Sequence, residues 1–258
     1  FFVMIGALMF LGCPLRMILR LGGGDLNALF GIAGFAGGVG IGTIFLKRGY
    51  SLQRTYALSK LESAIMPAIQ VGLLVLVVTA PAFIFFSQKG PGAMHAPWLI
   101  SLAAGLVVGG LSQYSRLCTV GGFRDLFLFK KSVLIFGYIA VLVGVFAVNI
   151  SFGNFHLGFE NQPVSHTDGL WNFLGMALAG FCSVLLGGCP LRQLIMTGEG
   201  NSDSAVTVLG LAAGAAFAHN FGLAASGAGP TLNGQIAVGI GFVVALIIAV
   251  LNTKRSNA

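Results

Sequence analysis

Charge is what this sequence has least of. Asp, Glu, Lys and Arg together make up 8% of its 258 residues, against roughly 25% in an average soluble protein. Because so few charges cannot cover a water-exposed surface, the composition excludes an ordinary soluble domain. Cysteine is also scarce: the four that occur lie mostly beside apolar, glycine-rich segments and do not indicate the disulfide framework of a small secreted protein.

The motifs of common enzymes and pumps are missing as well. The sequence contains no nucleotide-binding glycine loop, zinc-binding HExxH, dinucleotide fingerprint or serine elbow. It therefore gives no basis for ATP-driven transport by this chain, and we expect no cofactor and no bound metal. The formal net charge of +7 does not indicate nucleic-acid binding, because the basic residues fall in short loops between apolar segments.

Long apolar segments are what the sequence has instead. Hydrophobic residues make up 56% of the chain, and the mean hydropathy is +0.92. Since an apolar helix needs about 20 residues to cross a membrane, the sequence predicts an all-α, polytopic integral membrane protein, one transmembrane domain over residues 1–258. It has about eight predicted spans, of which the first is represented by its end: Phe1–Gly12, Leu26–Leu46, Ser63–Ser87, Trp98–Gln113, Ser132–Phe152, Leu170–Gly188, Ala205–Leu223 and Leu232–Leu251.

Two features of these spans leave room for alternatives. The short run from Trp98 and the segments that end near cysteines could instead be half-helices or re-entrant segments. The chain starts at Phe1 without an initiator methionine, so we expect it to be a fragment whose earlier residues are absent.

Lys and Arg are distributed unevenly between the loops. If the spans alternate in direction, one side of the membrane collects eleven of these residues and the other side three. Because short basic loops stay in the cytoplasm, we expect Lys47–Lys60, Lys130–Lys131 and the C-terminus to face the cytoplasm of a bacterial inner membrane. The eleven are Lys47, Arg48, Arg54, Lys60, Arg116, Arg124, Lys130, Lys131, Arg192, Lys254 and Arg255, and the three are Arg16, Arg20 and Lys89.

A five-residue string occurs twice. Gly12–Arg16 reads Gly-Cys-Pro-Leu-Arg, and the same residues recur at Gly188–Arg192, an offset of 176 residues. Each copy follows an apolar run and precedes a glycine-rich one, so we interpret the string as the mark of a duplication with units around 5–46 and 181–223. An odd number of predicted spans separates the copies. The sequence therefore predicts an inverted repeat, an architecture found in many transporters.

The repeated string suits a helix that begins inside the membrane. Pro is favoured at the first position of a helix, and Gly before Cys allows a tight turn. Cys13 and Cys189 would then lie at or near the N-caps of short re-entrant helices, whose free N–H groups attract anions. Arg16 and Arg192 would add positive potential nearby.

A third cysteine lies between two arginines, in a segment that reads Arg-Leu-Cys-Thr-Val-Gly-Gly-Phe-Arg-Asp. Arginines that face lipid are costly, so we expect Arg116 and Arg124 to line a polar path or to pair with Asp125. The thiol of Cys118 is a weak donor on a soft, polarizable atom. It suits a sulfur- or selenium-containing ligand better than a hard oxyanion such as phosphate.

The remaining polar residues are weaker candidates. Cys182 lies within a span without a neighbouring Pro, Arg or glycine pair, and we interpret it as a packing residue. His219 and Asn220, inside a predicted span, could line a path or simply hydrogen-bond to another helix. The other three histidines fall in loops, where we expect them to be solvated: His95, His156 and His166.

The ordered set of cysteine motifs resembles that of the YeeE/YedE membrane transporter family. The residues concerned are Leu11-Gly12-Cys13, Arg116-Leu117-Cys118 with Phe123-Arg124-Asp125, and Gly187-Gly188-Cys189, and the resemblance extends over essentially the whole chain. It implies import of an inorganic sulfur compound such as thiosulfate. It also implies that Cys13, Cys118 and Cys189 line a narrow central path and pass the ion along by weak thiol hydrogen bonds. The Cys-Pro-Leu-Arg form departs from the thiosulfate pattern and is similar to a YedE-like subgroup proposed to handle selenium.

We therefore interpret the chain as an importer of a small inorganic sulfur or selenium anion. Two alternatives stay open: a membrane-embedded sulfurtransferase that forms a persulfide on an activated cysteine, and a soft-metal carrier with cysteine ligands. Apart from the lipid bilayer, a cytoplasmic sulfur- or selenium-carrier protein is a reasonable partner, because the incoming species must be captured. The candidate binding residues are Cys13, Cys118, Cys189, Arg16, Arg116 and Arg192.

Overall fold

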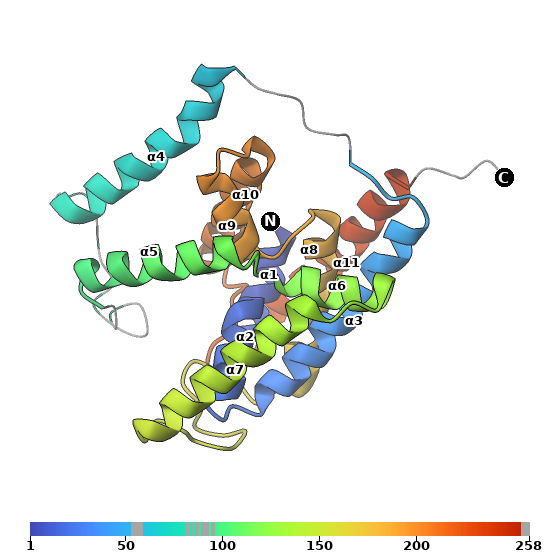
Figure 1. Ribbon diagram of the computed structural model, residues 1–258. Helices are drawn as coiled ribbons and strands as arrows, with labels where there is room; N and C mark the ends of the chain where they lie inside the picture. Colours follow the sequence, from blue (N-terminus) through green and yellow to red (C-terminus); the bar gives the residue numbers. More distant parts are fainter. Residues whose placement is uncertain are drawn as a thin grey trace.

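The computed structural model describes residues 1–52, 59–80 and 96–253, together with residues 83, 85, 88 and 93. Within these residues the chain is built of helices joined by turns, without a β-strand (Figure 1). In chain order the helices are α1 (Phe2–Phe10), α2 (Pro14–Gly22), α3 (Asn27–Lys47), α4 (Lys60–Thr79), α5 (Trp98–Tyr114), α6 (Thr119–Phe129), α7 (Val133–Ser151), α8 (Gly169–Leu185), α9 (Pro190–Gly198), α10 (Ser202–Asn220) and α11 (Leu232–Leu251).

The prediction of a polytopic helical membrane protein is confirmed. Six segments of the described chain are long and apolar enough to cross a membrane. Three of them consist of two consecutive helices with a break between them: α1–α2, α5–α6 and α8–α9. The six segments are Phe2–Gly22, Asn27–Lys47, Trp98–Phe129, Val133–Ser151, Gly169–Gly198 and Leu232–Leu251.

A helix is present at each of the eight predicted places, but two of these helices are not among the six. In α4 the apolar part, Ala64–Thr79, is shorter than a span, and part of the predicted Ser63–Ser87 lies outside the described residues. Helix α10 is 19 residues long but carries more polar side chains. The count of eight spans therefore stays a prediction. So does the orientation, for which Arg54, Lys89, Lys254 and Arg255 lie outside the described residues.

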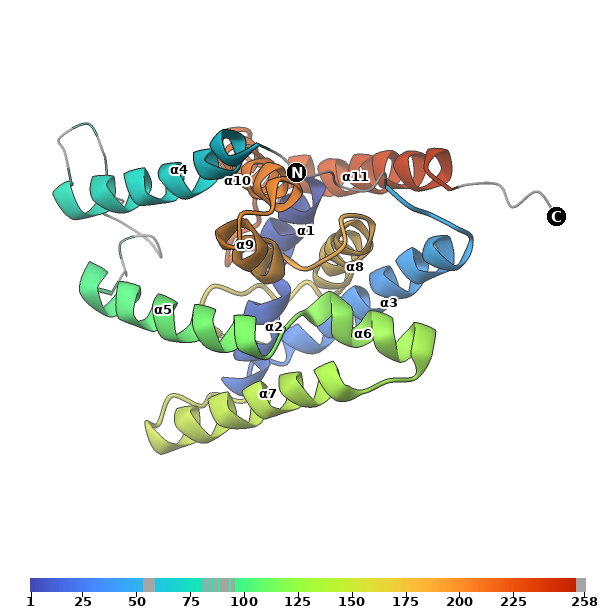
Figure 2. The ribbon, with the colours of Figure 1, turned by 45° about the horizontal axis from the view of Figure 1, so that its top comes forward.

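Helices α1 and α8 occupy the centre of the protein (Figures 1 and 2). One core cluster joins α1 and α8 to α10 and α11, and it contains Cys182. A second cluster joins α2, α3, α6, α7 and α8, and it contains Cys118 and Cys189. Helices α4 and α5 extend away from this centre in both views, whereas α7 lies along one edge.

Glycines set the closest approach between helices. A Cβ atom on Gly34 would clash with the carbonyl of Phe173, and one on Gly38 with the carbonyl of Ala177. Because both numbers rise together, α3 and α8 run in the same direction. Small residues at this spacing let helix backbones come into contact in a membrane.

The same contact recurs between α10 and α1. A Cβ atom on Gly214 would lie 2.7 Å from the carbonyl oxygen of Phe1. Gly38 and Ala177 become Gly214 and Phe1 when the partners are exchanged across the offset of 176 residues. The interface between α3 and α8 is thus related to the one between α10 and α1, in keeping with a duplication.

The two central helices run in opposite directions. The Phe1 end of α1 lies by Cys182, Gly6 approaches Gly175 and Ala179, and Met9 approaches Gly175. The chain therefore reaches the two copies of the cysteine string from opposite ends of the protein. The inverted repeat stays a prediction, with which these helix directions agree.

We predict that Gly38→Ala lowers the stability of the protein, because its new methyl group must push α3 away from the backbone of α8. Overpacking of this kind costs about 1–3 kcal/mol. Gly144→Ala in α7 is the matched control, since no atom lies within 4 Å of its added Cβ. Thermal unfolding of the purified protein in detergent checks this. Equal unfolding temperatures for the two variants would contradict the close contact.

Candidate functional site

Each candidate cysteine caps a short helix at a break. Cys13 precedes α2 with φ −75° and ψ 169°, and Cys189 precedes α9 with φ −74° and ψ 163°. Both are followed by Pro at the first helical position, so the predicted N-caps are confirmed. Cys118 caps α6 in a different extended conformation, and its sulfur accepts a hydrogen bond from the N–H of Gly121 at 3.4 Å. The sequence analysis did not predict this third cap.

The three breaks share one backbone geometry. Two residues before each cysteine the chain is left-handed, with φ 63° at Leu11, 52° at Arg116 and 89° at Gly187. The next N–H then bonds to the carbonyl five residues earlier, as in the Schellman motif that ends helices. These bonds are Gly12 N to Ala7 O at 2.8 Å, Leu117 N to Ser112 O at 3.0 Å and Gly188 N to Ser183 O at 3.0 Å.

Side chains satisfy the last carbonyl groups of α1. The end of this helix lies inside the protein, where unpaired backbone groups are costly. Arg20 donates from Nη1 to the carbonyl of Phe10 at 2.5 Å, and His166 Nε2 lies 2.8 Å from the carbonyl of Met9. The expectation that His166 is solvated is wrong: it is 2% exposed. Burial lowers the pKa of His166, which keeps the ring neutral, so Nε2–H donates.

The same guanidinium holds a buried ion pair. Arg20 Nε lies 2.7 Å from Asp25 Oδ2, and its Nη2 donates to Ser165 Oγ at 2.6 Å. The guanidinium carbon also lies 4.0 Å from the ring centroid of Phe10. The side chain of Asn27 donates to Asp25 Oδ1 at 2.9 Å. Sequence reasoning used Arg20 only as a loop charge; the signal for this network was an Arg and an Asp flanking three consecutive glycines.

The end of α8 is covered in a comparable way. Tyr50 donates from its hydroxyl to the carbonyl of Leu185 at 3.1 Å, and Gln193 donates to the carbonyl of Leu186 at 3.3 Å. Leu185 and Leu186 correspond to Met9 and Phe10 across the repeat offset. Burial raises the pKa of Tyr50, which follows α3. Both copies of the break therefore have side-chain donors on the same two carbonyl groups.

Two of the three candidate cysteines meet in the core. The side chains of Cys118 and Cys189 are close enough to interact, and they are 8% and 1% exposed. Cys13 is more exposed, and all three lie within electrostatic range of the Tyr138 hydroxyl. Cys182 lies in the other core cluster, as its interpretation as a packing residue requires. No group of three His, Cys, Asp or Glu that could hold a metal ion occurs among the described residues.

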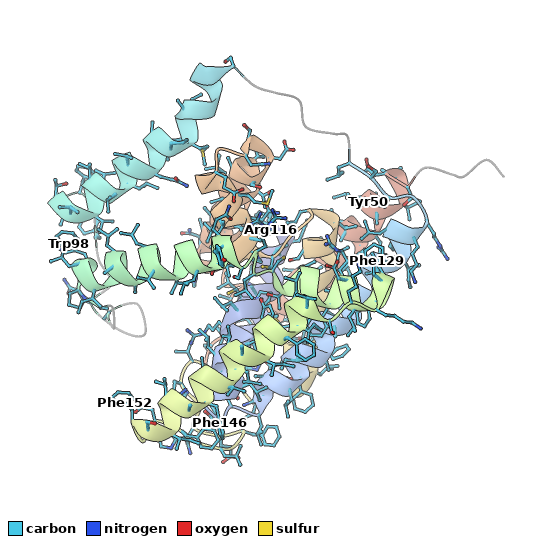
Figure 3. The ribbon with its side chains drawn as sticks, viewed as in Figure 1. Tyr50, Trp98, Arg116, Phe129, Phe146 and Phe152 are labelled. Carbon is cyan, nitrogen blue, oxygen red and sulfur yellow. The ribbon has the colours of Figure 1, made fainter. Side chains whose placement is uncertain are left out.

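The candidate arginines occupy separate places. Arg16 lines an open cavity of about 430 Å³ between α2, α7 and the loop that follows α7, together with Arg20 and Asn154. Arg192 donates to Gln113 Oε1 on α5 at 2.9 Å. Figure 3 shows Arg116 at the junction of α5 and α6, and its side chain is exposed.

The other polar candidates lie away from the cysteines. The expected ion pair of Arg124 is confirmed, with Nη2 3.0 Å from Asp125 Oδ1. His219 and Asn220 are exposed on α10, and Asn220 donates to the carbonyl of Ala216 in its own helix. His156 is exposed, as expected, and His95 lies outside the described residues.

Known proteins match much of this chain. The family model described as sulphur transport matches residues 114–254, which include two of the three candidate cysteines. The chain belongs to this family. The thiosulfate transporter TsuA of Escherichia coli (strain K12) is 27% identical over 115 residues, which are 42% of this chain. The chain spans about 30% of the length of that relative. No solved structure matches it.

These findings bear directly on the sequence-based resemblance. The matches to the sulphur transport family and to a thiosulfate transporter confirm membership of the YeeE/YedE family. Both describe transport, as the interpretation of the chain as a transporter rather than an enzyme requires.

Arg20→Met should destabilise the protein strongly, because it leaves the Asp25 carboxylate and the Phe10 carbonyl buried without their donor. Removing one partner of a buried ion pair costs about 3–5 kcal/mol. Arg20→Met with Asp25→Asn should lose less than the single variant, since no charge is then left unpaired. Arg48→Met is the control, because Arg48 is exposed at the end of α3. Thermal unfolding checks the order, and an Arg20→Met variant as stable as Arg48→Met would contradict it.

We expect Cys13 to react first when the folded protein is treated briefly with iodoacetamide. It is the one partly exposed cysteine of the four, all of which the structure describes, and thiol reactivity requires access. Mass spectrometry of the digested protein measures alkylation at each position. Denatured protein, in which all four should react, is the control. Faster labelling of Cys118 or Cys189 in the folded protein would contradict the burial described above.

Proposed function

We propose that this chain forms the conducting part of an importer for a small inorganic sulfur anion such as thiosulfate. One observation carries the proposal: in a member of a sulphur transport family, three free cysteines cap three helices at breaks around one buried region. The thiosulfate transporter among its relatives supports the substrate class. A bacterial inner membrane is the location we infer.

The entrance is proposed to be the open cavity at Arg16. This cavity also contains Asn154 and the exposed His156, so donors and positive charge are available to an arriving anion. Arg16 lies in the first turn of α2, the helix that Cys13 caps. The first thiol on the path would therefore be the most exposed of the four, and the anion would reach it without crossing lipid.

Beyond Cys13 the path would run between the buried thiols of Cys118 and Cys189. A thiol is a weak hydrogen-bond donor, so each site would hold the anion loosely. Conduction needs sites that bind well enough to admit an ion and weakly enough to release it. The N-termini of α2, α6 and α9 add free backbone N–H groups at each step.

On the far side the anion would pass Arg192, whose side chain links α9 to α5, and leave near Arg116. We expect release toward the cytoplasm, where a sulfur- or selenium-carrier protein would capture it. A selenium anion fits the same weak thiol contacts, so the ligand class includes it.

Uptake of labelled thiosulfate, selenite and sulfate tests the proposal, in cells that lack other sulfur importers and express this chain. Cys13→Ala, Cys118→Ala and Cys189→Ala should each reduce uptake of the preferred label to background, because each removes one site of the path. Cys182→Ala is the matched control and should transport like the parent chain.

The pattern among variants decides the outcome. Equal uptake by all four variants, at equal amounts of protein in the membrane, would contradict the thiol path. Absence of uptake of every label by the parent chain would contradict the transport function itself.

A further inference from the structure

Helix α7 places one polar side chain in the core. Most of its surface is exposed, and Tyr138 is its one buried residue, within a helix that the structure describes completely. A phenol is costly to bury in a membrane protein unless its hydroxyl has a partner. The partner is Thr119, to which the Tyr138 hydroxyl is hydrogen-bonded.

This pair of hydroxyl groups lies among the candidate cysteines. Thr119 is the first residue of α6, next to the capping Cys118, and it is fully buried. Both its side chain and its backbone interact with the thiol of Cys189. The Tyr138 hydroxyl is within electrostatic range of Cys118, Cys189 and Cys13.

Thiols alone suit only part of a sulfur oxyanion. Such an anion carries oxygen atoms, which are strong hydrogen-bond acceptors, and thiosulfate adds a terminal sulfur. A thiol is a weak donor, whereas a hydroxyl group donates a strong hydrogen bond, particularly to a charged acceptor. A path lined by thiols alone would leave the oxygen atoms poorly bound once water is lost.

We infer that Tyr138 and Thr119 form the oxygen-binding part of the path. Their hydroxyl groups donate hydrogen bonds to the oxygen atoms of the passing anion while the cysteine thiols contact its sulfur. This inference rests on the proposed function and assigns the substrate class to anions that carry both sulfur and oxygen.

The arrangement without an anion is consistent with this role. The two hydroxyl groups satisfy each other, so neither is a buried donor without a partner. Beside them lies an apolar cavity of about 120 Å³, lined by Ile18 of α2 and by Ile135 and Ile139 of α7. This space lets the Tyr138 ring shift when an anion separates the pair.

The test is the concentration dependence of thiosulfate uptake. Tyr138→Phe removes only the hydroxyl and should raise the half-saturating concentration about tenfold, the effect of losing one hydrogen bond to a charged group. Tyr114→Phe is the matched control, because Tyr114 is 92% exposed on α5, and it should keep the parent value. A purely structural role would lower the amount of folded protein and the maximal rate but would leave the half-saturating concentration unchanged.

A second pair of variants applies the same test to Thr119 and does not depend on the folding of Tyr138→Phe. Thr119→Val should raise the half-saturating concentration about tenfold, whereas Thr119→Ser, which keeps a hydroxyl group, should stay near the parent value. Parent-like values for Tyr138→Phe and Thr119→Val would overturn this inference and leave the transport function standing. A parent chain without thiosulfate uptake would overturn both.

Discussion

A helix that stops inside a membrane must find partners for the backbone groups that it leaves unpaired. The rest of this structure depends on that constraint. The Schellman bond satisfies one carbonyl group at each of the three breaks, and side chains satisfy others. Arg20 and His166 cover the end of α1, while Tyr50 and Gln193 cover the end of α8. The polar residues that look out of place in so apolar a chain are therefore the ones that allow its helices to break.

The breaks also explain how the chain is packed. Since α1 and α8 run antiparallel in the centre, their capping cysteines are approached from opposite ends, and Cys118 enters from a third helix pair at the side. Close contacts at Gly38 and Gly214 bring the flanking helices against this centre. Each of these glycines lies in the unit whose partner helix belongs to the other copy. The two copies thus support each other, and the third cysteine has no counterpart in the repeat.

The sequence predicts the parts of this architecture that are local. Apolar runs mark the helices, and Gly-Cys-Pro marks the caps at Cys13 and Cys189, because Pro after a turn starts a helix. The cap at Cys118 has no such mark: Thr follows the cysteine, and the left-handed residue is Arg116 rather than glycine. The burial of His166 depends on a carbonyl group 157 residues away along the chain. Such pairings are invisible until the loop is placed against α1.

The distribution of charge follows from the same constraint. The one guanidinium in the core, Arg20, is neutralised by Asp25 and committed to a helix end, so it cannot hold an anion tightly. The candidate arginines lie toward the outside: Arg16 in an open cavity, Arg116 exposed, and Arg192 bound to Gln113. Weak donors, thiols and hydroxyl groups, occupy the buried region between them. A site with full positive charge at its centre would bind a sulfur anion as a trap, whereas this order attracts it at the ends and holds it loosely in the middle.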